Sequence, residues 1–164
     1  MRKAVFAGTF DPLTKGHEEL VLRALSFFDE IVVAIGENPD KETMFTLEQR
    51  LIFLRTAFGE DIGSGKVSVA SYSGLTGDFA RSVGAGFLLR GVRGVMDFEY
   101  EKDLAEINRV LFPSIETVFL FSSSVLSGIS SSVVRKVLQA GCSGEVDILA
   151  FVSEKILPLL NVNK

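Results

Sequence analysis

The chain has 164 residues, 47% of them apolar and 23% charged, which excludes a disordered protein and is typical of one folded domain over residues 1–164. A net charge of −4 argues against a nucleic-acid-binding or anionic-membrane surface, because those surfaces are basic, and no stretch approaches about 18 apolar residues without a charge. The single cysteine, Cys142, excludes an internal disulfide framework and a cysteine-rich zinc site, so we expect a cytoplasmic protein with no nucleic-acid or membrane partner.

Short apolar runs bounded by turn residues alternate along the chain with longer stretches of helical periodicity. The runs are apolar throughout rather than alternating, as in strands that are buried on both faces. This pattern predicts an α/β fold: a single Rossmann-like domain, with a five-stranded parallel sheet, helices on both faces and a C-terminal helical region. The predicted strands are Lys3–Ala7, Glu30–Ile35, Lys66–Ser71, Gly86–Leu89 and Thr117–Phe121.

Capping residues define several of the helices predicted between these strands. Thr46 and Gln49 fit a capping box, and Gly59 suits the left-handed position after the helix that Thr46 opens. Ser130 and Ser143 are N-cap candidates for the last two helical segments. The predicted helices run from about Gly16 to Phe28, from Thr46 to about Phe58, from Thr76 to a stop at Gly84, over Asp97–Leu111, from Ser130 to about Ala140 before Gly141, and from Ser143 through Leu160 with breaks near Ser153 and Pro158.

The loop after the first strand is the first candidate site, because ligands of open parallel sheets bind beyond the carboxyl ends of the strands. Gly8 and Gly16 allow close approach of a ligand, and the helix start offers free N–H groups to phosphate. His17, the only histidine, stands at that helix start and could bind phosphate, transfer a proton or have a structural role. The loop is neither a P-loop nor a Gly-x-Gly-x-x-Gly fingerprint.

Three further segments could bind an anion at the same edge of the sheet. Arg90 and Arg93 follow the fourth predicted strand and either bind phosphate or form a solvated surface pair. Lys41 lies in a polar segment after the second strand, where an ordinary solvated lysine is equally compatible with the sequence. The serines at 130–132 stand at a helix start, where one can cap the helix and others can donate to phosphate.

Four motifs in register resemble one known family over essentially the whole chain. Gly8-Thr9-Phe10-Asp11-Pro12 followed by Thr14-Lys15-Gly16-His17 resembles the (His/Thr)-x-Gly-His signature of the nucleotidyltransferase superfamily. The chain resembles more closely the bacterial phosphopantetheine adenylyltransferases, through Lys41 before Met44-Phe45-Thr46, Arg90-Gly91-Val92-Arg93 before Asp97-Phe98-Glu99-Tyr100-Glu101, and Ile129-Ser130-Ser131-Ser132 at a late helix start. Each motif alone is weak evidence, but four in the same order and spacing are specific.

The resemblance implies transfer of an adenylyl group from ATP to 4′-phosphopantetheine, giving dephospho-CoA and pyrophosphate. It also implies Mg²⁺ accompanying ATP and a homohexamer. Because no cluster of carboxylates in the sequence suggests a dedicated metal site, we expect the ion to be held largely by the nucleotide phosphates and water. The catalytic residues that it implies are His17, Lys41 and Arg93, and the residues implied for phosphopantetheine are Thr9, Lys41, Thr76 and Arg90. The residues implied for ATP are Thr9, Phe10, His17, Gly91, Val92, Arg93, Glu101, Leu126, Ser127, Gly128, Ile129, Ser130, Ser131 and Ser132.

Three alternatives remain beside this interpretation. Another member of the superfamily could adenylate nicotinate mononucleotide or transfer CMP to a phosphoalcohol, although the cytidylyl type usually has histidine where this chain has Thr14. A nucleotide sensor without catalysis is disfavoured by the retained polar set, and a NAD-linked dehydrogenase by the missing glycine fingerprint. The chain also departs from the family at Leu126, where an aromatic residue is common.

Overall fold

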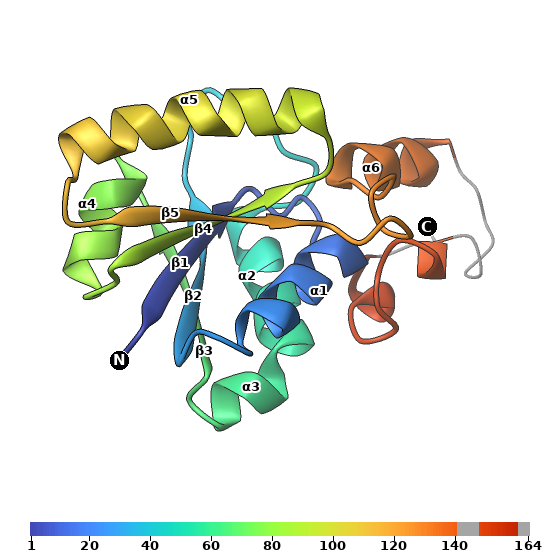
Figure 1. Cartoon of the computed structure of the whole chain (residues 1–164). Helices are drawn as coiled ribbons and strands as arrows, with labels where there is room; N and C mark the ends of the chain where they lie inside the picture. Colours follow the sequence, from blue (N-terminus) through green and yellow to red (C-terminus); the bar gives the residue numbers. More distant parts are fainter. Residues whose placement is uncertain (141–147, 161–164) are drawn as a thin grey trace.

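The computed structural model describes residues 1–140 and 148–160. Five strands form one sheet in which every neighbouring pair is parallel, in the order β3-β2-β1-β4-β5 (Figure 1). This arrangement confirms the predicted α/β fold with a five-stranded parallel sheet. The strands are β1 (Lys3–Gly8), β2 (Glu30–Gly36), β3 (Val67–Tyr72), β4 (Phe87–Val92) and β5 (Glu116–Phe121).

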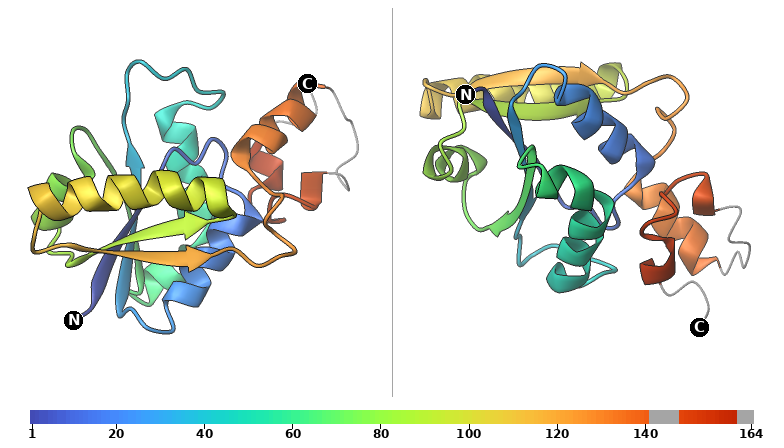
Figure 2. Two further views of the ribbon diagram at one scale, coloured as in Figure 1. Left: turned by 45° about the horizontal axis from the view of Figure 1, so that its top comes forward. Right: turned by 90° about the horizontal axis from the view of Figure 1, so that it is seen from below.

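Helices cover both faces of the sheet (Figures 1 and 2). Helices α1, α2 and α3 lie on one face, and α4 and α5 lie on the other. Helix α6 and the last described residues lie beyond the end of the sheet at which the strands point. The helices are α1 (Lys15–Ala24), α2 (Leu47–Ala57), α3 (Gly59–Gly63), α4 (Thr76–Ser82), α5 (Val95–Leu111), α6 (Ser131–Gln139) and the short 3₁₀ helix η1 (Leu157–Leu160).

The strand sequences explain why the sheet needs two helical layers. Successive side chains of a strand point to opposite faces. In β1, Ala4 and Phe6 belong to the core under α1 and α2, whereas Val5 and Ala7 belong to the core under α4. Because both sets are buried, an uninterrupted apolar strand is stable only between two covering layers.

The strand order reverses between β1 and β4, and this reversal positions the site. The chain runs outward from β1 to β2 and β3, then returns through α4 to place β4 on the other side of β1. The connections that leave β1 and β4 therefore run to opposite faces of the sheet, leaving a crevice at the carboxyl ends of these two strands.

Four of the five predicted strands agree with the structure to within one residue at either end. The prediction for the fourth was wrong at its end: β4 continues past Leu89 and includes Arg90, Gly91 and Val92. Arg90, Gly91 and Val92 pair with Phe119, Leu120 and Phe121 of β5, so the ladder runs through the polar residues that suggested a loop.

Two helix boundaries were also predicted wrongly. Helix α1 ends at Ala24 rather than near Phe28, and the Ser26 hydroxyl donates to the Arg23 carbonyl at 2.7 Å in the turn that follows. Gly59 is not left-handed but begins α3, where Glu60 and Asp61 in the first turn favour a new helix start. The capping box of Thr46 and Gln49 is confirmed, and so is the stop at Gly84, which has a φ of +69°.

The C-terminal helical region departs from the prediction in part. Its predicted start at Ser143, like Gly141 and Cys142, lies outside the described residues. From Ile148 onward the chain forms turns and is interrupted at Ser153 as predicted, but Pro158 lies within η1 rather than breaking it. Proline is tolerated there because the first N–H groups of a short helix have no partner within it. The buried residues that fix this region are Ile148, Val152, Ile156 and Leu160.

No helix among the described residues is long and apolar enough to cross a membrane.

Gly77 provides a test of the packing between α4 and the sheet. A Cβ at this helical position would overlap the ring of Phe112, which is 5% exposed. We expect Gly77→Ala to destabilise the protein by about 1–3 kcal/mol, because overpacking outweighs the gain in helix propensity. The matched control is Gly59→Ala, where a Cβ meets nothing within 4 Å. Thermal unfolding of both variants checks this, and equal midpoints would contradict it.

Candidate active site

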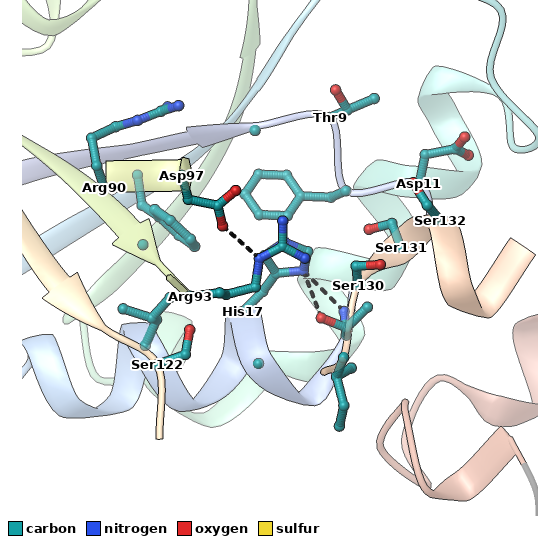
Figure 3. A pocket seen from close by; sticks show the side chains of 18 of the residues that line it. Thr9, Asp11, His17, Arg90, Arg93, Asp97, Ser122, Ser130, Ser131 and Ser132 are labelled. Carbon is teal, nitrogen blue, oxygen red and sulfur yellow. Dashed lines mark hydrogen bonds and ion pairs between the residues drawn. The ribbon is translucent and has the colours of Figure 1, made fainter. Parts of the chain in front are cut away.

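A cavity of about 420 Å³ lies at the carboxyl ends of β1 and β4 (Figure 3). The first loop, the Lys41 segment, the end of β4, the first turns of α5 and the start of α6 all contribute to its wall. Residues from four separate sequence motifs therefore meet in one place. The residues proposed from the sequence that line this cavity are Thr9, Phe10, His17, Lys41, Arg90, Gly91, Arg93, Glu101, Ile129, Ser130, Ser131 and Ser132.

His17 is held by the start of its own helix. Thr14 is the N-cap residue of α1, and its backbone N–H donates to Nδ1 of His17 at 3.2 Å. The Thr14 hydroxyl lies 3.0 Å from the same nitrogen. Because Nδ1 accepts the backbone N–H, the ring proton resides on Nε2, which is free to donate to a ligand. The rings of Phe6 and Phe10 pack against the imidazole, with centroids at 6.2 and 5.1 Å.

The environment of His17 keeps the imidazole neutral. Burial, and secondarily the positive charge of Arg93, lower the pKa of His17 from 6.5 to about 4. At neutral pH the ring is therefore a neutral hydrogen-bond donor and not a cation. This protonation state suits the binding of a phosphate oxygen through Nε2–H and does not suit proton donation as a general acid.

The lowered pKa of His17 predicts a pH dependence of stability. As the pH falls below 6.5, the unfolded state takes up a proton that the folded state does not accept until about pH 4. We therefore expect wild type to lose at most about 3 kcal/mol of unfolding free energy through this group between these two pH values. His17→Gln lacks the group, so the stability difference between the two proteins should change across this window. Denaturant unfolding at a series of pH values measures the unfolding free energy of both proteins. A difference between them that stays constant from pH 6.5 to pH 4 would contradict this prediction.

Arg93 follows β4 and lies close to His17 (Figure 3). Its Nε donates to Oδ2 of Asp97 at 3.0 Å. Asp97 lies four residues further along, in the first turn of α5. This contact uses Nε and leaves the two terminal nitrogens of the guanidinium with no hydrogen-bond partner among the described residues. A guanidinium held in this way presents a planar pair of donors to a phosphate.

Arg90 is held from two sides near the end of β4. Its Nη1 donates to the Ala7 carbonyl of β1 at 3.1 Å. Its Nε and Nη2 donate to the two carboxylate oxygens of Glu101 at 2.6 and 2.5 Å. The Arg90 side chain is 29% exposed and that of Glu101 is 13% exposed, so this bidentate pair fixes the arginine at the cavity wall.

A second cavity of about 310 Å³ adjoins the first, and Arg90 and Glu101 line both. Thr76 lines this second cavity, and its hydroxyl lies 2.7 Å from the hydroxyl of Tyr72. The rest of its wall is largely apolar, with one amide from α5. These further lining residues include Leu75, Leu104, Ala105, Ile107, Asn108 and Leu111.

Lys41 reaches back to the first loop. Its Nζ donates to the Thr9 hydroxyl at 3.0 Å, which joins the segment after β2 to the loop after β1. The sequence alone allowed an ordinary solvated lysine at this position. In the structure Lys41 is an exposed residue that lines the larger cavity, with its ammonium group against Thr9.

The serines at the start of α6 have three different partners. Ser130 is the N-cap, and its hydroxyl accepts from the Val133 N–H at 3.2 Å, as predicted. Ser131 donates to the Pro12 carbonyl at 2.8 Å, which holds α6 against the first loop. Ser132 accepts from Nη2 of Arg135 at 3.1 Å. All three line the larger cavity beside the free N–H groups of a helix start.

The charged groups of the larger cavity suit a polyanion. Lys41, Arg90, Arg93 and Arg135 are cationic, and the carboxylates of Asp97 and Glu101 are paired with arginines. Within residues 1–140 and 148–160, no group of three or more His, Cys, Asp or Glu side chains could hold a metal ion. The arrangement can bind and align phosphate groups through neutral N–H donors, arginines and two helix starts.

Comparison with known proteins identifies the family. Residues 5–137 match the cytidylyltransferase-like family. The phosphopantetheine adenylyltransferase of Flavobacterium johnsoniae is 50% identical to this chain over 149 residues, which cover 91% of this chain and 94% of that protein. The chain belongs to the phosphopantetheine adenylyltransferase family. The family member from Paraburkholderia xenovorans is 45% identical over 150 residues, covering 92% of this chain and 85% of that protein.

Solved structures of more distant proteins share the fold. The nicotinic acid mononucleotide adenylyltransferase of Plasmodium falciparum, complexed with NaAD, matches with a TM-score of 0.66 and 19% identity over 98% of this chain and 95% of that one. A putative nicotinate-nucleotide adenylyltransferase from Vibrio parahaemolyticus matches with a TM-score of 0.67 and 20% identity over 98% of this chain and 92% of that one. At 19–20% identity, the likeness to these two structures shows the fold of this chain and carries no information about its substrate.

Not every residue that the family resemblance implied lines a cavity. Val92, Leu126, Ser127 and Gly128 do not line either of the two cavities. Val92 is fully buried, and the Ser127 hydroxyl donates to the Ser124 carbonyl at 2.9 Å. The polar cavity residues that were not among the predicted site residues are Asp11, Thr14, Asp97, Tyr100, Ser122 and Arg135. Spacing gave a usable signal for Asp97 and Tyr100, because Asp97 stands three residues before Tyr100 and four before the predicted Glu101 and therefore shares a face of α5 with them.

Proposed function

We propose that this protein transfers the adenylyl group of ATP to the phosphate of 4′-phosphopantetheine, giving dephospho-CoA and pyrophosphate. The observation that supports this most directly is the junction of two cavities at Arg90, one surrounded by phosphate-binding groups and the other largely apolar. Relatives that are 45–50% identical over most of the chain are named phosphopantetheine adenylyltransferase. The activity belongs to coenzyme A biosynthesis.

The chemical step is an in-line displacement at the α-phosphorus of ATP. An oxygen of the acceptor phosphate forms the new P–O bond, the bond to the bridging oxygen between the α- and β-phosphates breaks, and pyrophosphate leaves with the electron pair. The acceptor phosphate is already an anion at neutral pH, so no general base is needed. The protein's contribution is to align two polyanions and to stabilise the charge that develops between them.

The larger cavity supplies the groups for the nucleotide phosphates. His17 Nε2–H and the N–H groups at the start of α1 would bind the α- and β-phosphates. Thr9 and Lys41 would lie at the reacting centre, and Arg93 would bind the departing pyrophosphate with the serines at 130–132. His17, Lys41 and Arg93 are each already held by a hydrogen bond within the protein, which limits reorganisation during the reaction.

The smaller cavity suits the acceptor. Arg90 at the junction would bind the phosphate of phosphopantetheine, and the pantetheine arm would extend along α5. Thr76 and Asn108 offer polar groups to amides of the arm, between apolar side chains that suit its methyl and methylene groups. This arrangement would place the acceptor phosphate beside the α-phosphate of ATP.

Mg²⁺ would enter the site with ATP. The carboxylates nearest the larger cavity are already engaged, since Asp97 and Glu101 pair with arginines and Asp11 accepts backbone N–H groups. The donor set therefore fits a cation that is held by nucleotide phosphates and water. The ion would neutralise charge on those phosphates, while the side chains described above orient them.

A product assay tests the function. The protein is incubated with ATP, MgCl₂ and one phosphorylated acceptor at a time: 4′-phosphopantetheine, nicotinate mononucleotide or glycerol 3-phosphate. Replacing ATP with CTP tests the cytidylyl alternative in the same format. We expect dephospho-CoA by mass spectrometry and pyrophosphate in equal amount only with ATP and phosphopantetheine. A preference for another acceptor or nucleotide, or binding without turnover, would overturn the proposal.

We also propose that the protein is a homohexamer in the cytoplasm, as the family resemblance implies. Large apolar side chains on α5 and near the end of β5 are solvent-exposed in the single chain, and a patch of this kind suits burial against further copies. Sedimentation velocity should give one species of six times the chain mass, and a monomer at micromolar concentration would contradict this. The exposed residues are Val95, Met96, Ile107, Val110, Leu111, Phe121 and Val125.

A further inference from the structure

Asp11 is a buried carboxylate in the first loop, with only 2% of the residue exposed. Its Oδ2 accepts the backbone N–H of Met44 at 2.9 Å, and its Oδ1 accepts the backbone N–H of Phe45 at 2.9 Å. One side chain therefore binds two consecutive peptide groups of a segment more than thirty residues away in the sequence. That segment begins immediately after Lys41 and leads into the N-cap of α2.

Two further hydrogen bonds join the same two parts of the chain, and a third lies within the second part. Lys41 Nζ donates to the Thr9 hydroxyl at 3.0 Å. Arg50, a buried side chain of α2, donates from Nη1 to the Thr9 carbonyl at 2.9 Å and from Nε to the Phe45 carbonyl at 3.1 Å. Thr9 and Asp11 on one side are thus fixed to Lys41, Met44, Phe45 and Arg50 on the other, and we call this set of bonds the loop clasp.

We propose that Asp11 is a positioning residue that holds the Lys41 segment over the reacting phosphates. This proposal deepens the proposed function and rests on it. A lysine side chain is a flexible four-carbon stem, so the backbone from which it extends must be fixed for its ammonium group to meet one site. The two hydrogen bonds to Asp11 fix that backbone three and four residues after Lys41.

The surroundings of Asp11 explain how a carboxylate can serve beside a phosphate site. Its side chain points away from His17 and Arg93 (Figure 3). Both oxygens are used by backbone N–H groups, and Nη1 of Arg135 lies 3.6 Å from Oδ2 and donates to the Asp11 carbonyl at 2.6 Å. These groups compensate the negative charge of the Asp11 carboxylate within the cavity wall. The carboxylate therefore repels an incoming polyanion only weakly.

A double-mutant cycle tests whether Asp11 acts through Lys41. The variants are Asp11→Asn, Lys41→Ala and the double substitution, with kcat and the KM for each substrate measured for adenylyl transfer. Asparagine keeps one acceptor oxygen but turns an NH₂ group toward one of the two N–H donors. We expect Asp11→Asn to lower kcat about 10- to 100-fold in the wild-type background, because displacements of roughly 1 Å at a reacting centre have effects up to this size. In the Lys41→Ala background we expect less than about a twofold change.

The outcomes separate positioning from general destabilisation. A loss of kcat by the same factor in both backgrounds, or an unchanged kcat in Asp11→Asn, would overturn the proposal. The matched control is Asp40→Asn, the same chemical change at an exposed acid next to Lys41, and it should keep kcat within about twofold.

A second measurement uses the wild-type protein, so it does not depend on whether a variant folds or on the identity of the reaction. Hydrogen exchange resolved to single amides should show Met44 and Phe45 protected at least about 100-fold relative to an unstructured chain. The amide of Glu42, an exposed residue, serves as the internal reference. Exchange of Met44 and Phe45 at the rate of Glu42 would show that the loop clasp does not form and would overturn the proposal. If these two amides are protected but the protein does not catalyse adenylyl transfer, only the proposed function is refuted.

Discussion

Replacing His17 with alanine should lower kcat for adenylyl transfer by about 10²- to 10³-fold, with the fold retained. The imidazole is held neutral with its proton on Nε2, so its contribution is one preorganised hydrogen bond to a phosphate oxygen. Removing one such donor costs about 2.7–4 kcal/mol of transition-state stabilisation in comparable sites. Steady-state kinetics with both substrates saturating measure the loss, and turnover near the wild-type rate would refute the role of His17.

The control for this experiment is His17→Gln, because His17 also caps its helix. The Thr14 N–H donates to His17 in a capping box, and glutamine at the same position can accept that bond. We therefore expect His17→Gln to keep more of the wild-type unfolding free energy at neutral pH than His17→Ala, by about 1 kcal/mol. Both variants should lose turnover, because neither presents an N–H at the position of Nε2 of the ring. Turnover near the wild-type rate in both variants would show that the histidine acts only as a cap.

Replacing Arg90 with alanine should weaken the use of phosphopantetheine far more than the use of ATP. The guanidinium is fixed by Glu101 and the Ala7 carbonyl at the junction of the two cavities. Loss of this group should reduce kcat/KM for phosphopantetheine by about 30- to 1,000-fold, corresponding to about 2–4 kcal/mol. Kinetics with each substrate varied in turn measure the difference, and an unchanged dependence on phosphopantetheine would refute the assignment.

Two controls separate phosphate binding from folding in the Arg90 experiment. Arg90→Ala strands the largely buried carboxylate of Glu101, which lowers stability independently of substrate. Adding Glu101→Gln should restore part of the unfolding free energy but not the acceptor kinetics. Arg55→Ala removes an exposed arginine of α2 that lines neither cavity, and we expect it to leave kcat/KM within about twofold.

The sheet could be predicted from the sequence because its signals are local. Strands buried on both faces are short apolar runs, and the structure confirms all five, with β4 extended by three residues. The predicted end of β4 was wrong because one residue has two roles: Arg90 pairs with β5 through its backbone and lines the cavity with its side chain. A polar residue at a strand end resembles a loop unless its pairing partner is known.

The site could be predicted only in part, for a different reason. His17, Arg90, Arg93 and the α6 serines follow strands or begin helices, and parallel topology brings such positions to one edge of the sheet. Asp11 was missed because its role depends on two backbone N–H groups far along the chain, and no local pattern records that contact. From the residues alone Glu101 looked like one of several surface glutamates, and only the family resemblance singled it out, for ATP; in the structure it pairs with Arg90.

The shared wall of the two cavities has a consequence for inhibitor design. Because Arg90 and Glu101 line both cavities, a synthetic molecule that occupies both cavities would pass along these two side chains. Such a compound would join an adenosine-like head to an amide-bearing tail through an anionic linker placed against Arg90. Since the entropy of association is lost once rather than twice, the joined molecule should bind much more tightly than either half.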